Sequence, residues 1–466
     1  MKKELSRRSF LKISALSGAL AGISGIGCSR GKTDVEELIE KISQGVPRTG
    51  KSVIGLTVPP IPQVKVGIIG LGNRGTGMTR HVHALFPDKA KITAICDIRK
   101  EKVEKTFEFL KENGQEPAVY SGTKDGWKEM VERDDIDLVF VFTHWDLHVP
   151  MCVYSMQQGK HVATEVPAAY TVEDCWKLVN TAEETRKNCM MLENVCYGSE
   201  ELWILNMVKQ GVFGTLTYAE AAYIHNLRGM LFGNSYYNKW RIRHHLKRHG
   251  NLYPTHGLGP VTQYMDIERG DRLEYLVSMS SPQASLTEHS KTVEPDNEFY
   301  DRSDFLHGDF NTSLIKTAKG RMIALKHDVV TPRPYNRINA IAGTKGYHEG
   351  YPSRLSLQEK GHSWLNEETY QEYREKYEHP IWETMREEIE KHGGHGGMDF
   401  VEIYRLIDNL NKGLPLDMDV YDAASWSVVS PLSEISVEME GVPVKFPDFT
   451  RGKWQEKREL GILKNI

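Results

Sequence analysis

Short apolar runs alternate with amphipathic stretches between residues 64 and 194. The runs predict strands at 64–70, 91–97, 136–143, 160–166 and 189–194, and the stretches predict helices around 73–86, 99–113, 147–158 and 172–187. Strands and helices that alternate at this spacing are typical of βαβ units, because a helix returns the chain to the same edge of a parallel sheet. We therefore expect a doubly wound, parallel Rossmann sheet in this α/β part of the chain.

The pattern changes after about residue 196. A helix is expected near 199–210, followed by strands at 218–226, 310–318, 321–330 and 337–343 and by helices near 367–392 and 398–412. Apolar and polar residues alternate in these strands, as they do in antiparallel sheets with one solvated face. Residues 232–256 read as a loop rich in aromatic and basic side chains. The pattern predicts an α+β C-terminal domain with a large open, mainly antiparallel sheet.

The N-terminus has the features of an export signal. The run Ser6-Arg7-Arg8-Ser9-Phe10-Leu11-Lys12 resembles the twin-arginine motif, and no charge follows Lys12 until Arg30. The uncharged stretch 13–29 is too short and too weakly apolar to predict a membrane span. We expect export by the twin-arginine route to the periplasm or cell surface. Gly27-Cys28 also resembles a lipobox, but Gly25 stands where that motif prefers Leu, so a lipid anchor at Cys28 is left open.

These features divide the chain into an export signal at 1–31, a linker at 32–62, a Rossmann domain at 63–196 and a substrate-binding α+β domain at 197–466. The linker reads as a short helix and then an extended segment that ends in Val58-Pro59-Pro60-Ile61-Pro62. An exported protein cannot count on a soluble pool of nicotinamide cofactor. Any dinucleotide that it uses should therefore travel with it and return to its starting state in every turnover.

Gly70-Leu71-Gly72-Asn73-Arg74-Gly75 forms a GxGxxG motif between the first expected strand and a helix. The first glycine permits a tight turn, the second lets the backbone approach a pyrophosphate, and the third allows close packing of helix and strand. The helix N-terminus faces the anion. Asp97 ends the second strand, where its carboxylate can accept hydrogen bonds from both ribose hydroxyls and would repel a 2′-phosphate. The motif therefore predicts NAD rather than NADP.

Two further segments lie at the carboxyl ends of expected strands, where open α/β sheets bind ligands. Thr143-His144-Trp145-Asp146-Leu147-His148 follows the strand at 136–143, and Thr164-Glu165-Val166-Pro167 follows the strand at 160–166. Their position predicts contacts on the nicotinamide side of the cleft. The alternatives are that Trp145 is a half-buried packing residue and that His148 caps a helix.

Composition narrows the class of ligand. The chain has 59 Lys and Arg against 63 Asp and Glu, a net charge of −4, which argues against a nucleic acid partner. Its six cysteines include no CxxC pair, which argues against a disulfide scaffold and a zinc site, and we expect no metal. The 18 His, 20 Tyr and 9 Trp combine flat apolar faces with polar tips, which suits sugars and other polyols.

Five motifs carry a resemblance to a known family. They are LGNRG at 71–75, WDLH at 145–148, TEVP at 164–167, YPTH at 253–256 and GHGGMDF at 394–400. With them the chain resembles glycoside hydrolase family 109, the NAD-dependent α-N-acetylgalactosaminidases, within the glucose–fructose oxidoreductase and inositol dehydrogenase superfamily. The resemblance runs from the export signal through Gly397. It implies NAD as the cofactor and a small glycoside or a glycan terminus as the substrate.

The motif and the resemblance together assign residues to the site. The predicted NAD contacts are Gly70, Gly72, Asn73, Arg74, Asp97, Trp145, Asp146, Leu147, His148, Glu165, Val166, Asn194 and Tyr253. The predicted substrate contacts are Tyr223, Arg241, Tyr253, Pro254, Thr255, His256 and Tyr335, of which His256, Tyr253 and Tyr335 are the predicted catalytic residues. We expect the glycine-rich stretch 392–397 to be a close-packed loop near the site.

Val166 stands where dehydrogenases of the superfamily typically carry a Lys that assists proton transfer, which weakens a simple dehydrogenase interpretation. Most glycosidases use two carboxylates, but a nicotinamide site offers another route. The sugar is oxidised at C3, a base removes the C2 proton, the C1 substituent is eliminated, water adds at C1, and C3 is reduced again. The net redox change is zero, which fits an exported protein that holds its own cofactor.

The predicted residues suit this cycle. His256 fits the acid–base role at the C3 hydroxyl, because imidazole titrates near neutral pH. Tyr253 would assist it, or act as the C2 base if nearby cations acidify its phenol. Tyr335 and Tyr223 would orient hydroxyl or acetamido groups, and Arg241 would supply a fixed fork of donors.

The sequence is compatible with three classes of function. The leading one is a hydrolase of terminal α-linked N-acetylgalactosamine with NAD as a non-consumed cofactor. The alternative is an NAD-dependent sugar or cyclitol dehydrogenase with net oxidation of its substrate, and the third is a non-catalytic sugar-binding or NAD-sensing protein. The intact polar set at 223, 241, 253, 256 and 335 argues against the third class. The sequence leaves the sugar, the aglycone and homo-oligomerisation open.

Overall fold

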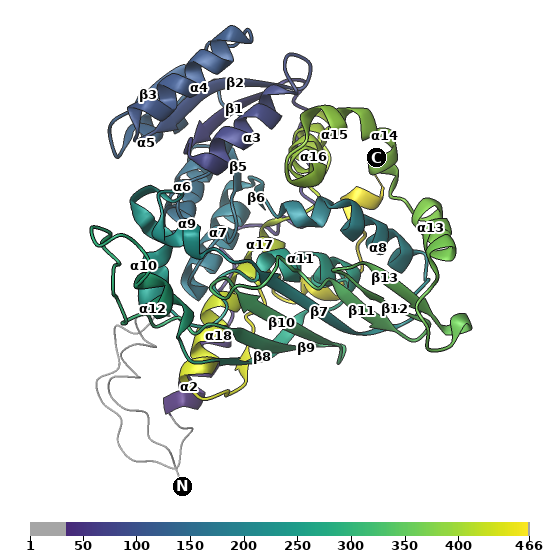
Figure 1. The fold of residues 1–466 in the computed structure, drawn as a ribbon. Helices are drawn as coiled ribbons and strands as arrows, with labels where there is room; N and C mark the ends of the chain where they lie inside the picture. Colours follow the sequence, from purple (N-terminus) through teal and green to yellow (C-terminus); the bar gives the residue numbers. More distant parts are fainter. Residues whose placement is uncertain (1–33, 465–466) are drawn as a thin grey trace.

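The computed structural model describes residues 34–464. The predicted export signal and Cys28 lie outside the described residues. Figure 1 shows two sheets, with the purple and blue N-terminal unit above and the teal and green second sheet below. No helix within residues 34–464 is long and apolar enough to cross a lipid bilayer.

The N-terminal unit is the predicted Rossmann sheet. Its strands are β1 (Val64–Ile69), β2 (Ala90–Asp97), β3 (Ala118–Ser121), β4 (Leu138–Val141), β5 (His161–Thr164) and β6 (Cys189–Met191), in the order β3-β2-β1-β4-β5-β6. All of them pair in parallel. The helices are α3 (Asn73–His83), α4 (Lys100–Glu112), α5 (Gly126–Val131), α6 (Trp145–Gln157) and α7 (Val172–Thr185). The doubly wound α/β fold class is confirmed, with β3 and α5 in addition to the elements expected.

The second sheet has eight strands in the order β13-β12-β11-β7-β10-β9-β8-β14. They are β7 (Leu216–Ile224), β8 (Leu273–Ser280), β9 (Asn311–Thr317), β10 (Met322–Asp328), β11 (Ala340–Gly343), β12 (Gly346–Glu349), β13 (Arg354–Leu357) and β14 (Val444–Lys445). Every pair is antiparallel except β7 with β10, which run in parallel. The prediction of an open, mainly antiparallel sheet is confirmed.

Helices α8 (Ser199–Lys209) and α11 (Thr255–Tyr264) lie over the second sheet on the side of the Rossmann unit (Figure 1). The other longer helices of this part of the chain are α10 (Trp240–Lys247), α13 (Glu367–Lys376), α16 (Met398–Lys412), α17 (Val420–Ser427) and α18 (Val429–Glu438). The shorter ones are α9 (Arg228–Phe232), α12 (Ser285–Ser290), α14 (Pro380–Thr384), α15 (Arg386–His392) and the 3₁₀ turns η1 (Asn194–Tyr197), η2 (Tyr237–Lys239), η3 (Gln358–Lys360), η4 (His395–Gly397), η5 (Lys453–Gln455) and η6 (Gly461–Leu463).

Two expected elements differ from the structure. The helix predicted at 367–392 is three helices, since Pro380 lacks the backbone N–H that would continue α13 and instead begins α14. The loop predicted at 232–256 contains α10, which buries Arg241, Ile242 and His245 on one face. The hydrophobic pattern did not predict this helix, because two of its three buried residues, Arg241 and His245, are polar.

The C-terminal helices return to the Rossmann unit. Helix α16 lies against α3 and η1, and α17 lies against α7 and β6. Residues before β1 join them there: α2 (Asp34–Ser43) precedes a segment in which Val53 donates its backbone N–H to Tyr421 and Ile61 donates to the carbonyl of Leu410. The linker at 32–62 is therefore packed on the body of the protein over its described part. The four-part division of the chain stays a prediction.

A buried ion pair joins the middle of α16 to the segment that follows the helix. Arg405 donates to both carboxylate oxygens of Asp417 at 2.9 and 2.7 Å, and the two side chains are 1% and 2% exposed. Tyr197 of η1 also donates to Asp417, at 3.3 Å. The pair therefore locks α16 against the loop that follows β6.

We expect Asp417→Ala to lower the free energy of unfolding by about 3–5 kcal/mol, because it leaves the Arg405 guanidinium buried without its carboxylate. Chemical unfolding followed by tryptophan fluorescence measures the loss. Lys177→Ala is the control, because its ion pairs with Glu173 and Asp174 are solvent-exposed and contribute about 0–1 kcal/mol. A loss in Asp417→Ala no larger than that of the control would contradict the assigned role.

Candidate active site

The GxGxxG turn has the backbone geometry of a pyrophosphate cradle. Gly70 has φ +93°, and a Cβ atom on it would lie 2.6 Å from the carbonyl oxygen of Phe142. A Cβ atom on Gly75 would lie 2.0 Å from the carbonyl oxygen of Gly70, so the third glycine allows the close helix packing. At Gly72, which caps the N-terminus of α3, a Cβ atom would meet only the guanidinium of Arg99, at 3.5 Å. The amides at this helix end are therefore open to an anion, which fits a dinucleotide.

Asp97 lies at the end of β2 beside this turn. Its Oδ2 accepts the backbone N–H of Leu71 at 2.7 Å, and Arg99 donates to both carboxylate oxygens at 3.0 Å. Arg99 also lies 5.0 Å from the ring centroid of Tyr237, and Asn73 donates to the carbonyl of Ser235 at 3.2 Å. The segment 233–239 of the second unit therefore reaches over the turn that would hold the dinucleotide.

Arg74 connects three parts of the chain. It donates to Glu165 at 2.7 Å and to Asp399 at 2.6 Å, and Asn194 donates to the other oxygen of Asp399 at 2.6 Å. Burial opposes ionisation of Asp399, but the hydrogen bond from His395 and the charge of Arg74 outweigh it and hold the pKa of that carboxyl below its ordinary value. Asp399 was not among the predicted site residues. The Oδ1 atom of Asn194 is buried without a partner within the described chain, which leaves an acceptor for a ligand.

The glycine-rich stretch before Asp399 is close-packed at Gly394 and Gly397, whereas Gly393 and Gly396 have open space around them, so the expectation of a close-packed loop holds only in part. A Cβ atom on Gly394 would lie 2.5 Å from Nε2 of His81, and one on Gly397 would lie 2.3 Å from the side chain of Ile389. Both glycines have positive φ, +90° and +101°. These glycines let the chain turn sharply into α16 and deliver Asp399 to Arg74.

The turns after β4 and β5 are held together by side chains. The indole N–H of Trp145 donates to the carbonyl of Val166 at 3.2 Å. The two ring nitrogens of His148 lie 2.9 Å from the carbonyl of Pro167 and 3.1 Å from that of Thr143. Burial lowers the pKa of His148, although the two carbonyl contacts oppose this shift, and both ring nitrogens face main chain rather than an open site. Its predicted NAD contact stays a prediction, and the structure gives it a positioning role.

Asp146 and Leu147 lie between Trp145 and His148 in the sequence. The side chain of Asp146 is 66% exposed and lies 3.7 Å from both His144 and His244. Leu147 is half-buried. Within residues 34–464, neither side chain forms a hydrogen bond or ion pair with the GxGxxG turn, and their predicted NAD contacts stay predictions.

The predicted substrate residues form one cluster beside these turns. The ring centroids of Tyr223, Tyr253 and His256 lie 4.6 Å (Tyr223–Tyr253), 5.3 Å (Tyr223–His256) and 4.9 Å (Tyr253–His256) apart. The guanidinium of Arg241 lies 4.8 Å from the Tyr253 ring and 4.9 Å from the Trp145 ring. Since Trp145 begins α6 of the Rossmann unit, the cluster stands where the two units meet.

A buried carboxylate holds His256. Thr255 begins α11, Pro254 precedes it as the N-cap, and His256 falls in the first turn. Nδ1 of His256 lies 2.7 Å from Oε1 of Glu193, whose side chain is fully buried. The Nε2 atom of His256 forms no hydrogen bond within residues 34–464. Glu193 therefore fixes the orientation of the imidazole ring and leaves Nε2 available for a ligand. The sequence analysis did not predict this role of Glu193.

The phenols of the cluster are protonated. Burial raises the pKa of Tyr253 well above its ordinary value, and the nearby charge of Arg241 offsets this only in part. Burial also raises the pKa of Tyr223, whose hydroxyl lies 3.0 Å from Nδ1 of His225. Burial therefore works against the acidified phenol that Tyr253 would need as the C2 base, and that role stays a prediction. Both tyrosines are hydrogen-bond donors.

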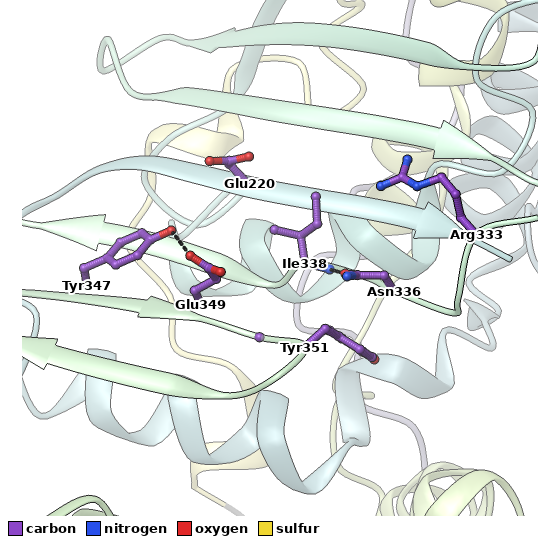
Figure 2. A pocket seen from close by; sticks show the side chains of 8 residues that line it. Glu220, Arg333, Asn336, Ile338, Tyr347, Glu349 and Tyr351 are labelled. Atoms are coloured by element: carbon purple, nitrogen blue, oxygen red, sulfur yellow. Dashed lines mark hydrogen bonds between the residues drawn. The ribbon is translucent and has the colours of Figure 1, made fainter. Parts of the chain in front are cut away.

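Tyr335 lies at the open edge of the cluster. Its ring centroid is 5.1 Å from that of His225 and 6.3 Å from that of Tyr223, and the side chain is 39% exposed. Arg337 donates to its hydroxyl at 2.9 Å. A pocket of about 260 Å³ lies next to it, lined by Glu220, Arg333, Asn336, Ile338, Tyr347, Glu349, Gly350 and Tyr351. Figure 2 shows this pocket, in which Tyr347 donates to Glu349.

Comparison with known proteins agrees with this geometry. A family model described as the glycosyl hydrolase 109 C-terminal domain matches residues 197–456, and one described as the oxidoreductase family NAD-binding Rossmann fold matches residues 64–193. A glycosyl hydrolase family 109 protein of Shewanella pealeana is 46% identical over 466 residues, which cover 99% of both chains. Another, from Shewanella sp. strain W3-18-1, is 49% identical over 424 residues, covering 90% of this chain and 92% of its own.

Solved structures share the fold at low identity. A levoglucosan dehydrogenase in complex with NADH and levoglucosan has a TM-score of 0.64 at 15% identity, covering 83% of this chain and 100% of its own. The scyllo-inositol dehydrogenase of Lactobacillus casei with bound NAD(H) and scyllo-inositol has a TM-score of 0.58 at 14% identity, covering 82% and 99%. The predicted family and cofactor are confirmed. The chain belongs to glycosyl hydrolase family 109, and its N-terminal unit is an NAD-binding Rossmann domain.

Proposed function

We propose that the protein hydrolyses terminal α-linked N-acetylgalactosamine, with NAD as a cofactor that is not consumed. The observation that carries the proposal is the Glu193–His256 pair, set among neutral phenols beside an NAD-binding domain. Val166 supports it as well, because it removes the Lys that a simple dehydrogenase would use. Family membership supports a glycoside hydrolase, and the choice of sugar rests on the resemblance in the motifs.

Bound NAD would supply a reversible oxidation at C3 of the sugar. Gly70, Gly72 and the start of α3 would hold its pyrophosphate, and Asp97 its ribose. His256 takes the proton of the C3 hydroxyl at Nε2 and later returns it. Glu193 accepts the N–H of Nδ1 during this exchange, so the imidazole keeps the tautomer and orientation that leave Nε2 free.

The surrounding side chains bind and orient. Tyr223 and Tyr253 donate hydrogen bonds to ring hydroxyls, since burial keeps their phenols protonated. Arg241 is nine-tenths buried and lies against Tyr253, so it is a fixed cation beside oxygen atoms that gain negative charge during enolisation. Tyr335, at the exposed edge, would meet the acetamido group or the aglycone.

The purified protein, with no NAD added, should cleave a p-nitrophenyl α-N-acetylgalactosaminide. In D₂O the released sugar should carry deuterium at C2, because the cycle removes the C2 proton and replaces it from solvent. Release of p-nitrophenol and mass spectrometry of the sugar measure the two effects. A panel of other α- and β-glycosides serves as the control for specificity.

Two outcomes would count against the proposal in different ways. Cleavage without deuterium at C2 would leave a hydrolase but exclude the oxidation–elimination cycle. Accumulation of one NADH per sugar consumed, with an oxidised product, would show the sugar or cyclitol dehydrogenase instead.

Glu193→Gln should lower kcat by about 10²–10⁴-fold with little change in KM. An amide can donate to Nδ1, which would place the imidazole proton on Nε2, the wrong nitrogen for accepting one from the sugar. Glu193→Asp should recover part of the loss, since it restores a carboxylate. Steady-state kinetics measure kcat and KM separately, and NAD content and thermal unfolding serve as controls. A fall in NAD content that accounts for the lost activity would assign Glu193 to cofactor binding instead.

We also propose that the chain is exported through the twin-arginine route, on the strength of the motif at 6–12. Replacing both Arg7 and Arg8 by Lys should leave the protein in the cytoplasm, because the motif requires the arginine pair. Cell fractionation with an antibody measures this. Cys28→Ser in the exported protein tests the lipid anchor: a shift from the membrane to the soluble fraction would support it. Export of the double Lys variant at the wild-type level would refute the route.

A further inference from the structure

A second, larger cavity lies behind the cluster of substrate residues. Its volume is about 790 Å³, within the range of about 300–1,000 Å³ that is usual for small-molecule sites. The lining comes from the starts of α6 and α7, from η2 and α10, and from Leu306 and Glu438. None of the predicted or observed catalytic residues at 223, 253, 256 and 335 lines it.

Helix α10 separates this cavity from the proposed catalytic cluster. One face of the helix carries Arg241, which lies against Tyr253. The adjacent face, about 100° round the helix from Arg241, carries Trp240, His244 and Lys247, which line the cavity. Trp145 forms part of the wall between them. The two sites are thus neighbours that share Trp145 in their wall, while the proposed catalytic residues lie on one side only.

Flat aromatic surfaces dominate one side of the cavity. The Trp145 ring centroid lies 4.7 Å from that of Tyr170, 4.8 Å from that of Trp240 and 5.0 Å from that of His244. These rings present edges and faces at several angles, with interplanar angles of 44°, 70° and 54°. Such a surface suits the apolar faces of a pyranose ring.

Two buried polar groups of the lining have no partner within residues 34–464. The hydroxyl of Tyr170 and the Nδ1 atom of His249 are both buried, and each residue is only 7% exposed. Nε2 of His249 is already paired with Glu438 at 3.0 Å. Buried polar atoms are costly unless they are hydrogen-bonded, so these two call for a ligand with hydroxyl groups or for water.

The charges of the lining nearly cancel. Arg248 is bound by Glu434 and Arg243 by Glu298, while Asp174 receives Lys177. Lys247 then remains with Asp146 and with Glu438, which is paired with His249, so the lining holds three cations and three carboxylates in all. A cavity for a phosphate or a polyanion would show an excess of cations. This lining therefore favours a neutral, hydroxylated ligand.

We propose that this cavity, which we call the α10 cavity, is a second carbohydrate site that binds a neutral sugar unit separate from the one that reacts. It does not depend on the proposed reaction, because no residue of the catalytic cluster contributes to it. In a longer glycan, it would hold a unit of a neighbouring branch or chain and would raise affinity without changing the chemical step.

The test titrates the NAD-loaded protein with lactose, a neutral disaccharide, and follows the fluorescence of the lining tryptophans. Leu306→Trp should weaken lactose binding at least tenfold, because Leu306 is 37% exposed at the rim and the larger ring would fill the entrance. Leu314→Trp is the matched control, since Leu314 is 41% exposed on β9 and does not line the cavity. It should bind lactose as the wild type does.

A second variant tests the polar contact. Tyr170→Phe removes only the unpartnered hydroxyl and should weaken lactose binding by about three- to tenfold, with unchanged thermal unfolding and NAD content. Equal lactose affinity in the wild type, Leu306→Trp and Tyr170→Phe would overturn the proposal, as would the absence of millimolar binding in the wild type. Displacement of lactose by inorganic phosphate would show an anion site instead. Binding is measured without turnover, so failure of the proposed hydrolysis would not affect this result.

Discussion

The site depends on one buried carboxylate that the C-terminal part of the chain supplies to the Rossmann unit. Asp399 accepts hydrogen bonds from Arg74 at the start of α3 and from Asn194 at the start of η1. It thereby fixes α16 against the cofactor turn and against η1, while Glu165 binds the other side of Arg74. Loss of Asp399 would leave Arg74 with Glu165 alone and would free Asn194 from α16. The NAD site is therefore a property of both units together.

The same short segment also reaches the proposed acid–base residue. Glu193 and Asn194 are consecutive after β6, yet Glu193 holds His256 of α11 and Asn194 holds Asp399 of α16. Any shift of this segment would move the imidazole and the cofactor turn at the same time. Distances between the reacting sugar and the nicotinamide must be held within fractions of an ångström, because misplacement of about 1 Å can cost 10²-fold in rate. A shared anchor is a direct physical way to hold them.

Hydrophobic pattern was enough to predict the architecture, because βαβ spacing and strand alternation are local properties. It could not predict that β7 and β10 run in parallel, since pairing direction depends on where the intervening chain returns. The motifs placed the glycines, Arg74 and His256 in the site. They missed Glu193 and Asp399, because a carboxylate among 63 acidic residues shows its role only when the fold brings its partner within 3 Å. The GHGGMDF motif contains Asp399 and could have indicated its role, but from this motif we expected only a close-packed loop.

The proposed export adds a constraint on how the cofactor is held. Outside the cytoplasm, a dissociated NAD would not be replaced, so an exported enzyme would have to retain its NAD between turnovers. Segment 233–239 contributes to this, because it joins the second unit to the cofactor turn through Asn73 and Arg99. Asn238 and Lys239 adopt positive φ values there, +50° and +47°, a conformation that only fixed surroundings maintain in residues other than glycine. Helix α10, which carries Arg241, follows this segment directly, so one short stretch of chain contacts the cofactor turn and positions Arg241 beside Tyr253.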